Sequence, residues 1–162
     1  MMKLDIFTTG GTIDKTYFDA KSDYKVGESQ IGAILHEAAV TFDFEVHALC
    51  RKDSLELTDE DRTMIHDAVA AADASHVLIT HGTDTMTHTA ERLRDIAGKT
   101  IVLTGALAPA KFRASDAVFN IGGAVAAAQS LPAGVYIFMN GQVFEAGRVQ
   151  KNREAGRFEP VA

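Results

Sequence analysis

The sequence predicts a doubly wound α/β domain around a mostly parallel sheet of about five strands. Three observations lead to this fold class. Short apolar runs alternate with longer stretches of helical character along the chain. The connections between them are mostly short, as in βαβ units. No composition shift, repeat or low-complexity segment interrupts the pattern, so we expect residues 1–162 to form a single domain.

The expected strands are short runs that are either apolar or alternate between apolar and polar residues. Residues 4–8 are typical of a buried strand, whereas residues 44–50 alternate with the period of two that a half-buried strand shows. Further strands are expected at 76–80, 100–104 and 135–139. Each is followed by a turn or by a stretch with helical character, as a parallel sheet requires.

The expected helices fill the intervals between the strands. They cover residues 28–40, 58–74, 86–96 and 115–131. Thr58 precedes a carboxylate-rich first turn, which indicates an N-cap. Residues 13–27 are polar and lack a period, so we expect a loop whose length is typical of a functional lid. The tail from residue 140 predicts a short hairpin or an irregular arm.

Composition excludes several classes of partner. The net charge is −6 and no basic cluster occurs, which argues against nucleic acid or an anionic membrane as the ligand. No stretch approaches the roughly 20 apolar residues that a membrane-spanning helix needs. The start of the chain lacks a signal-peptide pattern, and a single cysteine, Cys50, fits a reducing compartment. We therefore expect a cytoplasmic protein.

Two threonine-bearing glycine turns are the most informative feature. Thr8-Thr9-Gly10-Gly11-Thr12 follows the first expected strand, and Thr80-His81-Gly82-Thr83-Asp84-Thr85 follows the third. In open α/β sheets, ligands bind at the carboxyl ends of the strands. Hydroxyls and a carboxylate from the two turns are therefore expected to converge on one small molecule. This set of groups suits attack on an acyl carbon better than phosphate binding.

Each of these residues also has a structural interpretation. Thr12 is a nucleophile that needs a base or relay, or it is a capping residue in a tight turn. Asp84 caps the following helix or binds a substrate ammonium group. His81 is a general base or, more commonly at a strand end, a hydrogen-bonded scaffold residue. Lys151 is a surface lysine, or a buried amine that activates a hydroxyl.

Other polar residues bear on the same edge of the sheet. Lys52, Asp53 and Ser54 follow the second strand and offer a cation, a carboxylate and a hydroxyl. Gly10 and Gly11 let the backbone turn sharply and present N–H groups to an oxyanion. The six histidines show no HExxH or paired-ligand spacing, so we expect no metal site.

Taken together, these motifs resemble the bacterial-type L-asparaginases of the asparaginase/glutaminase family. The resemblance lies in Thr-Gly-Gly-Thr at 9–12, His-Gly-Thr-Asp-Thr-Met at 81–86 and Leu-Thr-Gly-Ala at 103–106. Asp-Tyr-Lys-Val-Gly at 23–27 and Ser-Asp-Ala-Val-Phe-Asn at 115–120 extend it. It covers essentially the whole chain but corresponds only to the N-terminal domain of the usual two-domain enzyme. Lys-Asp-Ser-Leu at 52–55 resembles the short, single-domain forms.

The resemblance implies roles for particular residues. Thr12 corresponds to the nucleophile and Tyr24 to the tyrosine of a flexible loop that assists it. Thr83, Asp84 and Lys151 correspond to a second triad, in which Lys151 is assigned from its spacing after the last strand. The residues implied in substrate binding are Gly11, Lys52, Asp53, Ser54, Gly82 and Asp84.

The resemblance also implies an activity. It is hydrolysis of L-asparagine to L-aspartate and ammonia, without a cofactor, by a homodimer or homotetramer. A family Ser-Gln pair is replaced here by Arg51 and Lys52, so Lys52 is the expected cation for the substrate α-carboxylate. Two alternatives stay open: a catalytically weak domain that binds or senses an amino acid, and a fragment that functions only with a separate partner chain.

Overall fold

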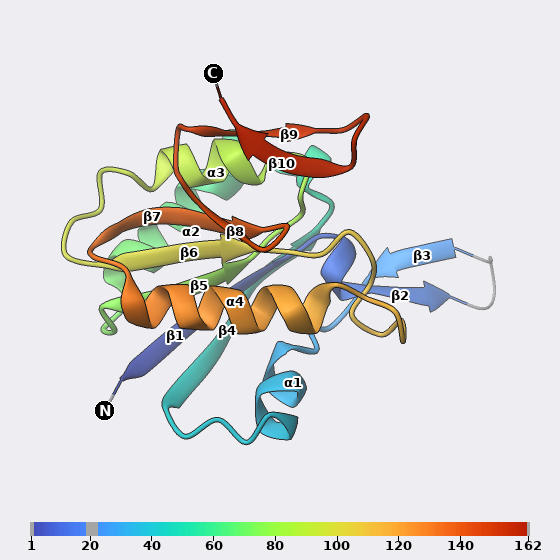
Figure 1. Ribbon diagram of the computed structural model, residues 1–162, viewed down its shortest axis with the longest axis horizontal. Helices are drawn as coiled ribbons and strands as arrows, with labels where there is room; N and C mark the ends of the chain where they lie inside the picture. The colour runs from blue at the N-terminus through green and yellow to red at the C-terminus, as the bar shows by residue number, and fades with distance from the viewer. Residues whose placement is uncertain (1, 19–22, 162) are drawn as a thin grey trace.

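The computed structural model describes residues 2–18 and 23–161, and for Tyr17, Phe18, Asp23 and Tyr24 the backbone alone. Its centre is a six-stranded sheet in the order β4-β1-β5-β6-β7-β8 (Figure 1). The first five of these strands are parallel, and β8 pairs antiparallel with β7. The strands of this sheet are β1 (Lys3–Gly10), β4 (Asp43–Lys52), β5 (His76–Thr80), β6 (Thr100–Thr104), β7 (Gly134–Met139) and β8 (Gln142–Glu145).

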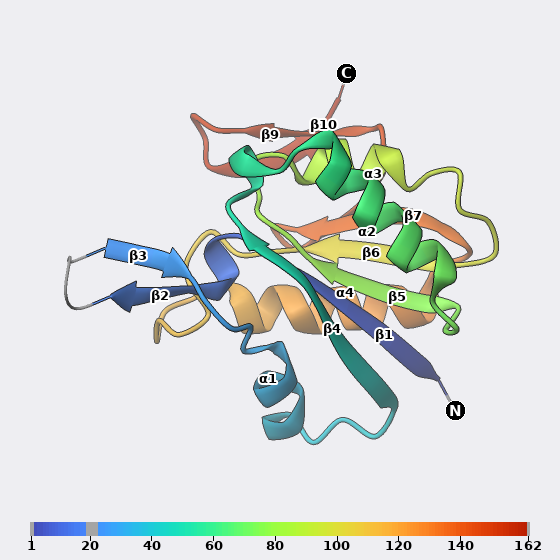
Figure 2. The same cartoon turned by 180° about the vertical axis from the view of Figure 1, so that it is seen from behind.

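Helices cover both faces of this sheet. They are α1 (Ile31–Glu37), α2 (Asp59–Ala71), α3 (Met86–Arg92) and α4 (Ala117–Ser130). α1 and α4 lie on the face seen in Figure 1, and α2 and α3 lie on the opposite face (Figure 2). No helix among the described residues is long and apolar enough to cross a membrane.

Alternation along the strands divides the core into two layers. Leu4 and Ile6 of β1 pack toward α4, while Phe7 packs toward α2 and α3. In the central strands β5 and β6 nearly every residue is buried and the three middle residues of each are apolar, because helices cover both faces. The predicted doubly wound α/β fold is therefore confirmed, and strands 76–80 and 100–104 have the predicted bounds.

Two segments differ from the expectation. The sheet has six strands rather than about five, because the tail adds β8 at its edge. The hairpin expected in the tail is confirmed and consists of β9 (Val149–Asn152) and β10 (Arg157–Pro160), which form a separate sheet. The expected loop at 13–27 was wrong for most of its length. It contains a 3-10 turn at Thr12–Asp14 and a hairpin of β2 (Lys15–Phe18) and β3 (Asp23–Val26). Threonine, aromatic residues and valine in these strands favour extended backbone.

The topology creates a crevice between β1 and β5. From β1 the chain passes to β4 on one side and then returns to β5 on the other side of β1. The connections that leave β1 and β5 therefore run to opposite sides at the carboxyl ends of the strands, which is where open α/β sheets bind ligands. Both threonine-bearing turns lie at this switch point.

Candidate active site

The two glycine turns touch each other through their main chains. A Cβ added to Gly11 would lie 2.4 Å from the Cα atom of Gly82, and one added to Gly82 would lie 2.6 Å from Cβ of Ser54. Gly11 also has a φ of 86°, a conformation that favours glycine. The turns after β1, β4 and β5 thus meet with no room for side chains at these two positions. The structure thus brings the two turns together, whereas the expected convergence of their hydroxyls and carboxylate on one small molecule stays a prediction.

Lys151 connects the second turn to the tail hairpin. Its Nζ donates to Thr83 Oγ1 at 2.7 Å and to Asp84 Oδ1 at 2.7 Å. The lysine side chain is 14% exposed and that of Asp84 is 34% exposed, so the contact is partly shielded from water. Phe158 of β10 is buried in the core and anchors the hairpin that carries Lys151. The position assigned from spacing alone thus lies within hydrogen-bond reach of the motif.

Asp84 sits in a positively charged environment. The hydrogen bond from Lys151 is the main cause that holds the pKa of its carboxyl below the ordinary value, and charges on Arg153 and Lys15 act in the same direction. Nε of Arg153 lies 3.6 Å from Asp84 Oδ1. The helix that follows has Thr85 as its N-cap and no side-chain cap, so Asp84 does not serve as the helix cap. The lowered pKa keeps the Asp84 carboxyl ionised, so it is an anion beside Lys151.

Thr12 lies on the first turn, directly after Gly11. Within the parts of the chain that the structure describes, its hydroxyl has no hydrogen-bond partner. Tyr24 belongs to β3, but its side chain lies outside the described residues, so its assisting role stays a prediction. The N–H of Gly11 donates to the carbonyl of Lys52 at 2.9 Å and is not available to an oxyanion. Among the described residues, the N–H groups of Thr12 and Thr83 have no protein acceptor and can serve instead.

His81 is a scaffold residue. It is fully buried, and its ring nitrogens lie 2.7 Å from Gly82 O and 2.7 Å from Thr89 Oγ1. Burial lowers the pKa of His81 to about 4, which keeps the ring neutral at physiological pH. The ring therefore fixes the carbonyl of Gly82 and ties the turn to α3. This supports the scaffold interpretation over the general base.

Lys52 at the end of β4 and the two residues that follow it each contact another side chain or the main chain of the protein. Lys52 Nζ bonds Asp61 Oδ2 at 2.8 Å, at the start of α2. Asp53 lies 3.3 Å from Nζ of Lys15. Ser54 is buried; its Oγ accepts from the N–H of Thr85 at 3.2 Å and its carbonyl accepts from Thr85 Oγ1 at 2.9 Å. Their predicted roles in substrate binding stay predictions, and Lys52 would have to leave Asp61 to take up a carboxylate.

Residues 115–120 hold the turn after β6. The carboxylate of Asp116 accepts from the N–H groups of Leu107 and Ala108 at 3.0–3.1 Å. Asn120 Nδ2 donates to the carbonyl of Gly105 at 2.8 Å. A Cβ at Gly105 would lie 2.3 Å from the carbonyl oxygen of His81, so this turn supports the second glycine turn directly.

Sequence reasoning missed two residues close to Thr12 in the chain. Lys15 acts on Asp84 electrostatically and lies next to Asp53, yet only its proximity to Thr12 in the chain could have identified it. Asp14 is buried with its Oδ1 atom unpaired, beside a cavity of ≈ 260 Å³ that Ser29 and Arg51 also line. A buried carboxylate two residues after a glycine turn leaves no signal in the pattern of apolar residues.

The buried carboxyl of Asp14 makes the stability of the fold depend on pH. Burial raises the pKa of this carboxyl from 3.8 to about 6, while Ser29 and Arg51 oppose the shift. The folded chain thus holds the proton more tightly than the unfolded chain. The free energy of unfolding therefore falls as the pH rises from 3.8, the pKa in the unfolded chain, through about 6, the pKa in the folded chain. Asp14→Asn is expected to raise the free energy of unfolding by about 1–3 kcal/mol near pH 8 and to change it little near pH 4.

Urea unfolding at the two pH values checks this prediction. Glu154→Gln, which removes an exposed carboxylate from the β9–β10 turn, is the matched control and should leave stability unchanged at both. An Asp14→Asn effect of equal size at both pH values would contradict the buried-charge explanation.

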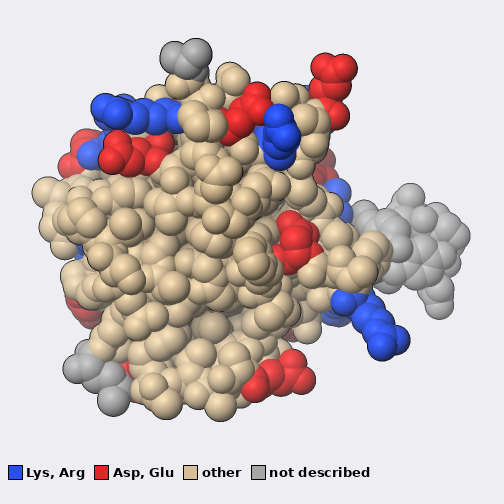
Figure 3. Space-filling view, viewed as in Figure 1, with Lys and Arg blue, Asp and Glu red and all other residues tan. Residues whose placement is uncertain are grey.

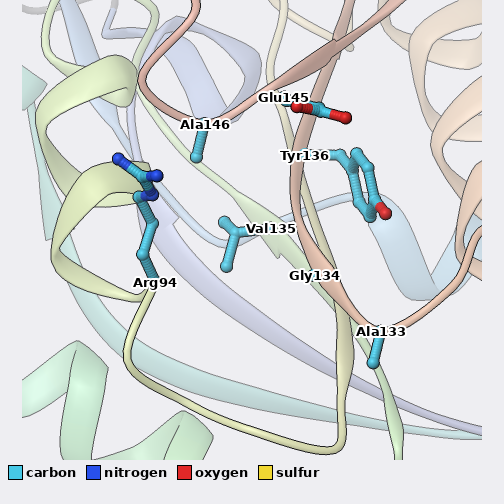
Figure 4. Close-up of a pocket in the computed structure, with 7 residues that line it drawn as sticks. All are labelled: Arg94, Ala133, Gly134, Val135, Tyr136, Glu145 and Ala146. Carbon is cyan, nitrogen blue, oxygen red and sulfur yellow. The ribbon is translucent and has the colours of Figure 1, made fainter.

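A separate hollow of ≈ 240 Å³ lies away from these residues. Figure 4 shows that it is lined by the side chains of Arg94, Val135, Tyr136, Glu145 and Ala146, together with the backbone around Gly134. Gly134 and its partner Thr100 begin β7 and β6, so this hollow lies toward the amino ends of the strands. None of the expected site residues lines it.

Comparison with known proteins agrees with this geometry. Residues 3–158 match the family model described as Asparaginase, N-terminal. The chain is 32% identical over 160 residues to a protein of Haemophilus influenzae named probable L-asparaginase periplasmic, covering 91% of this chain and 46% of that one.

Two solved structures have the same fold. The thermostable L-asparaginase from Thermococcus kodakarensis superposes with a TM-score of 0.84 at 27% identity, covering 99% of this chain and 51% of that one. L-asparaginase I from Vibrio cholerae gives a TM-score of 0.83 at 26% identity, covering 98% and 51%. The chain spans about half the length of these relatives. It therefore belongs to the asparaginase family and corresponds to the N-terminal domain of the L-asparaginases.

Proposed function

We propose that this chain hydrolyses the side-chain amide of L-asparagine to give L-aspartate and ammonia. The observation that carries the proposal is the contact of Lys151 with both Thr83 and Asp84, beside the turn that bears Thr12. Amide hydrolysis by a threonine requires groups of this kind. They are the Thr83 hydroxyl held by the Lys151 ammonium, the Asp84 carboxylate, and the Thr12 hydroxyl, which has no partner among the described residues.

In the proposed reaction, Oγ1 of Thr12 attacks the amide carbon. Its proton passes to the relay formed by Thr83, Lys151 and Asp84, which later returns a proton to the leaving nitrogen. The N–H groups of Thr12 and Thr83 stabilise the oxyanion. Collapse of the tetrahedral intermediate breaks the C–N bond, and the nitrogen leaves as ammonia after protonation. Water then attacks the acyl-enzyme ester, which releases L-aspartate and restores the hydroxyl. Asp84 accepts hydrogen bonds from the substrate α-ammonium group throughout.

Ammonia release from purified protein tests the proposal directly. We expect turnover with L-asparagine and slower turnover with L-glutamine, because a pocket distinguishes one methylene by only about 1–3 kcal/mol. The alternative is a domain that binds or senses an amino acid; it is favoured by the observation that, among the described residues, no general base contacts the hydroxyl of Thr12. Calorimetric binding of L-aspartate without ammonia release from L-asparagine would support that alternative.

The α-carboxylate of the substrate needs a cation, and we consider two lysines among the described residues. Lys52 is held by Asp61 at the start of α2, whereas Lys15 acts on the Asp84 carboxylate. We expect Lys15→Ala to raise KM for asparagine about 10-fold or more with a smaller change in kcat, because a carboxylate remote from the reacting amide contributes uniform binding.

Lys52→Ala serves as the matched variant in steady-state assays. If KM rises only in Lys52→Ala, the lysine leaves Asp61 when substrate binds and Lys15 is not the carboxylate partner. Unchanged KM in both variants would assign the α-carboxylate to backbone N–H groups.

We further propose a homodimer or homotetramer. The face that carries α4 shows few charged side chains (Figure 3), and Val118 and Phe119 there are 62% and 65% exposed. Exposed apolar surface of this kind often marks an interface, and closed symmetry dominates homo-oligomers. Sedimentation velocity measures the assembly, and a monomer at micromolar concentration would contradict it.

A further inference from the structure

Three potential metal ligands meet near the amino ends of β1 and β4, at the opposite end of these strands from Thr12. They are Asp5 of β1 and Glu45 and His47 of β4, and their ligand atoms all lie within 4.8 Å of one another. Asp5 pairs with Glu45 in the parallel register, and Phe7 pairs with His47. Because side chains alternate between the faces of a sheet, all three project toward α2. Figure 2 shows β1, β4 and α2 on this side of the molecule.

Asp5 is a buried carboxylate with one unused oxygen. The residue is 3% exposed, and its Oδ2 accepts from the N–H of Ala74 at 3.1 Å. Within the described part of the chain Oδ1 accepts no hydrogen bond, although Nε2 of His47 lies 3.5 Å away. A buried acceptor left without a partner destabilises the folded chain, and a charged acceptor does so more strongly than a neutral one. A carboxylate buried in this way indicates a positively charged partner at Oδ1.

The distances between the donors fit one metal ion. Nε2 of His47 lies 3.5 Å from Asp5 Oδ1 and 3.9 Å from Glu45 Oε2. Ligands at about 2.0–2.2 Å from a tetrahedral ion are about 3.4 Å apart. The three groups also line a cavity of ≈ 250 Å³, which leaves space for water as a fourth ligand. The imidazole ring stacks on Phe7 with centroids 5.0 Å apart, which fixes its orientation.

We propose that Asp5 Oδ1, Glu45 Oε2 and His47 Nε2 bind a divalent transition-metal ion such as Zn²⁺. Imidazole with two carboxylates suits Zn²⁺ better than the harder Mg²⁺ or Ca²⁺. The ion would fasten edge strand β4 to β1. Lys3 lies 3.7 Å from Glu45 Oε2 and competes for that carboxylate. The histidine spacing predicted no metal site, because the ligands come from two strands that are distant in the sequence.

Zn²⁺ titration of the full chain, free of any affinity tag and stripped with a chelator, tests the proposal. All proteins carry Cys50→Ser so that the thiol does not bind the metal. Calorimetry should give one Zn²⁺ per chain, and Asp5→Asn and His47→Ala should each weaken binding about 10-fold or more. Asp5→Asn keeps an oxygen for the N–H of Ala74. The control is His66→Ala, which removes a histidine paired with Asp67 and Asp95 and should leave binding unchanged.

A second readout keeps the test decisive if Asp5→Asn does not fold. Co²⁺ in a tetrahedral site with one nitrogen and two carboxylate donors gives visible d–d absorption, which His47→Ala should abolish. Zn²⁺ should raise the melting temperature of the parent protein and not that of His47→Ala. Absence of binding at micromolar Zn²⁺, or binding that survives both substitutions, would overturn the proposal in favour of a direct contact between His47 and Asp5 without a metal. Neither readout depends on amide hydrolysis.

Discussion

Replacing Thr12 with alanine is expected to lower kcat for L-asparagine by about 10³-fold or more while the fold stays intact. The reason is that no other hydroxyl lies on the turn that follows Gly11, and the loss of a nucleophile removes the covalent route entirely. Within the described residues the Thr12 hydroxyl has no hydrogen-bond partner, so its removal should change the free energy of unfolding by no more than about 0.5 kcal/mol.

Steady-state ammonia release and urea unfolding measure these two effects separately. Thr12→Ser keeps a hydroxyl and should retain far more activity than Thr12→Ala. If Thr12→Ala keeps more than about a tenth of kcat, a barrier change below ~1.4 kcal/mol, the nucleophile lies elsewhere and Thr83 is the next candidate.

The second large effect concerns the contact between the second turn and the tail hairpin. Thr83→Val and Lys151→Met are each expected to lower kcat about 10²-fold or more, and the double variant should be little worse than either single one. The Lys151 ammonium touches Thr83 and Asp84 at 2.7 Å each, and groups that act as one unit lose their effect together. Multiplicative losses would show that Lys151 acts independently of Thr83.

Lys151→Met also has a signature that a merely structural residue would lack. The lysine is the main cause of the lowered pKa of Asp84, so its loss should move the acid limb of the pH–activity profile upward. Arg153→Met is the matched control, because this exposed side chain also approaches Asp84 but at 3.6 Å. We expect less than a 10-fold loss in kcat from it, since exposed ion pairs are weak.

The sequence predicted best those elements that are buried on both faces. Residues 76–80 and 100–104 each hold three consecutive apolar residues between polar ends, so their bounds were predictable from pattern alone. The helix expected at 28–40 forms only at Ile31–Glu37, because helix ends depend on local capping and Ala39 takes a positive φ of 54°. β8 was not predicted, because it lies at the edge of the sheet and alternates weakly between polar and apolar residues.

The candidate site was predictable to a similar degree. Thr12 and the second turn follow recognisable strands, and family motifs identified them. By contrast, the pairing of Lys52 with Asp61 depends on how the end of β4 meets the start of α2. The charge of Lys15 beside Asp53 depends on the direction of the β2–β3 hairpin. Such contacts arise from tertiary geometry and leave no periodic pattern in the chain.

The main-chain contact between Gly11 and Gly82 limits how the proposed active site can be engineered. Alanine at Gly11 would push the turns after β1 and β5 apart, since its Cβ would lie 2.4 Å from the neighbouring backbone. Directed evolution of substrate range therefore cannot proceed through these glycines without moving Thr12 relative to Thr83. Diversity is better introduced at the exposed side chains around the crevice, Asp53 and Arg153 among them, where the backbone that aligns the two hydroxyls stays untouched.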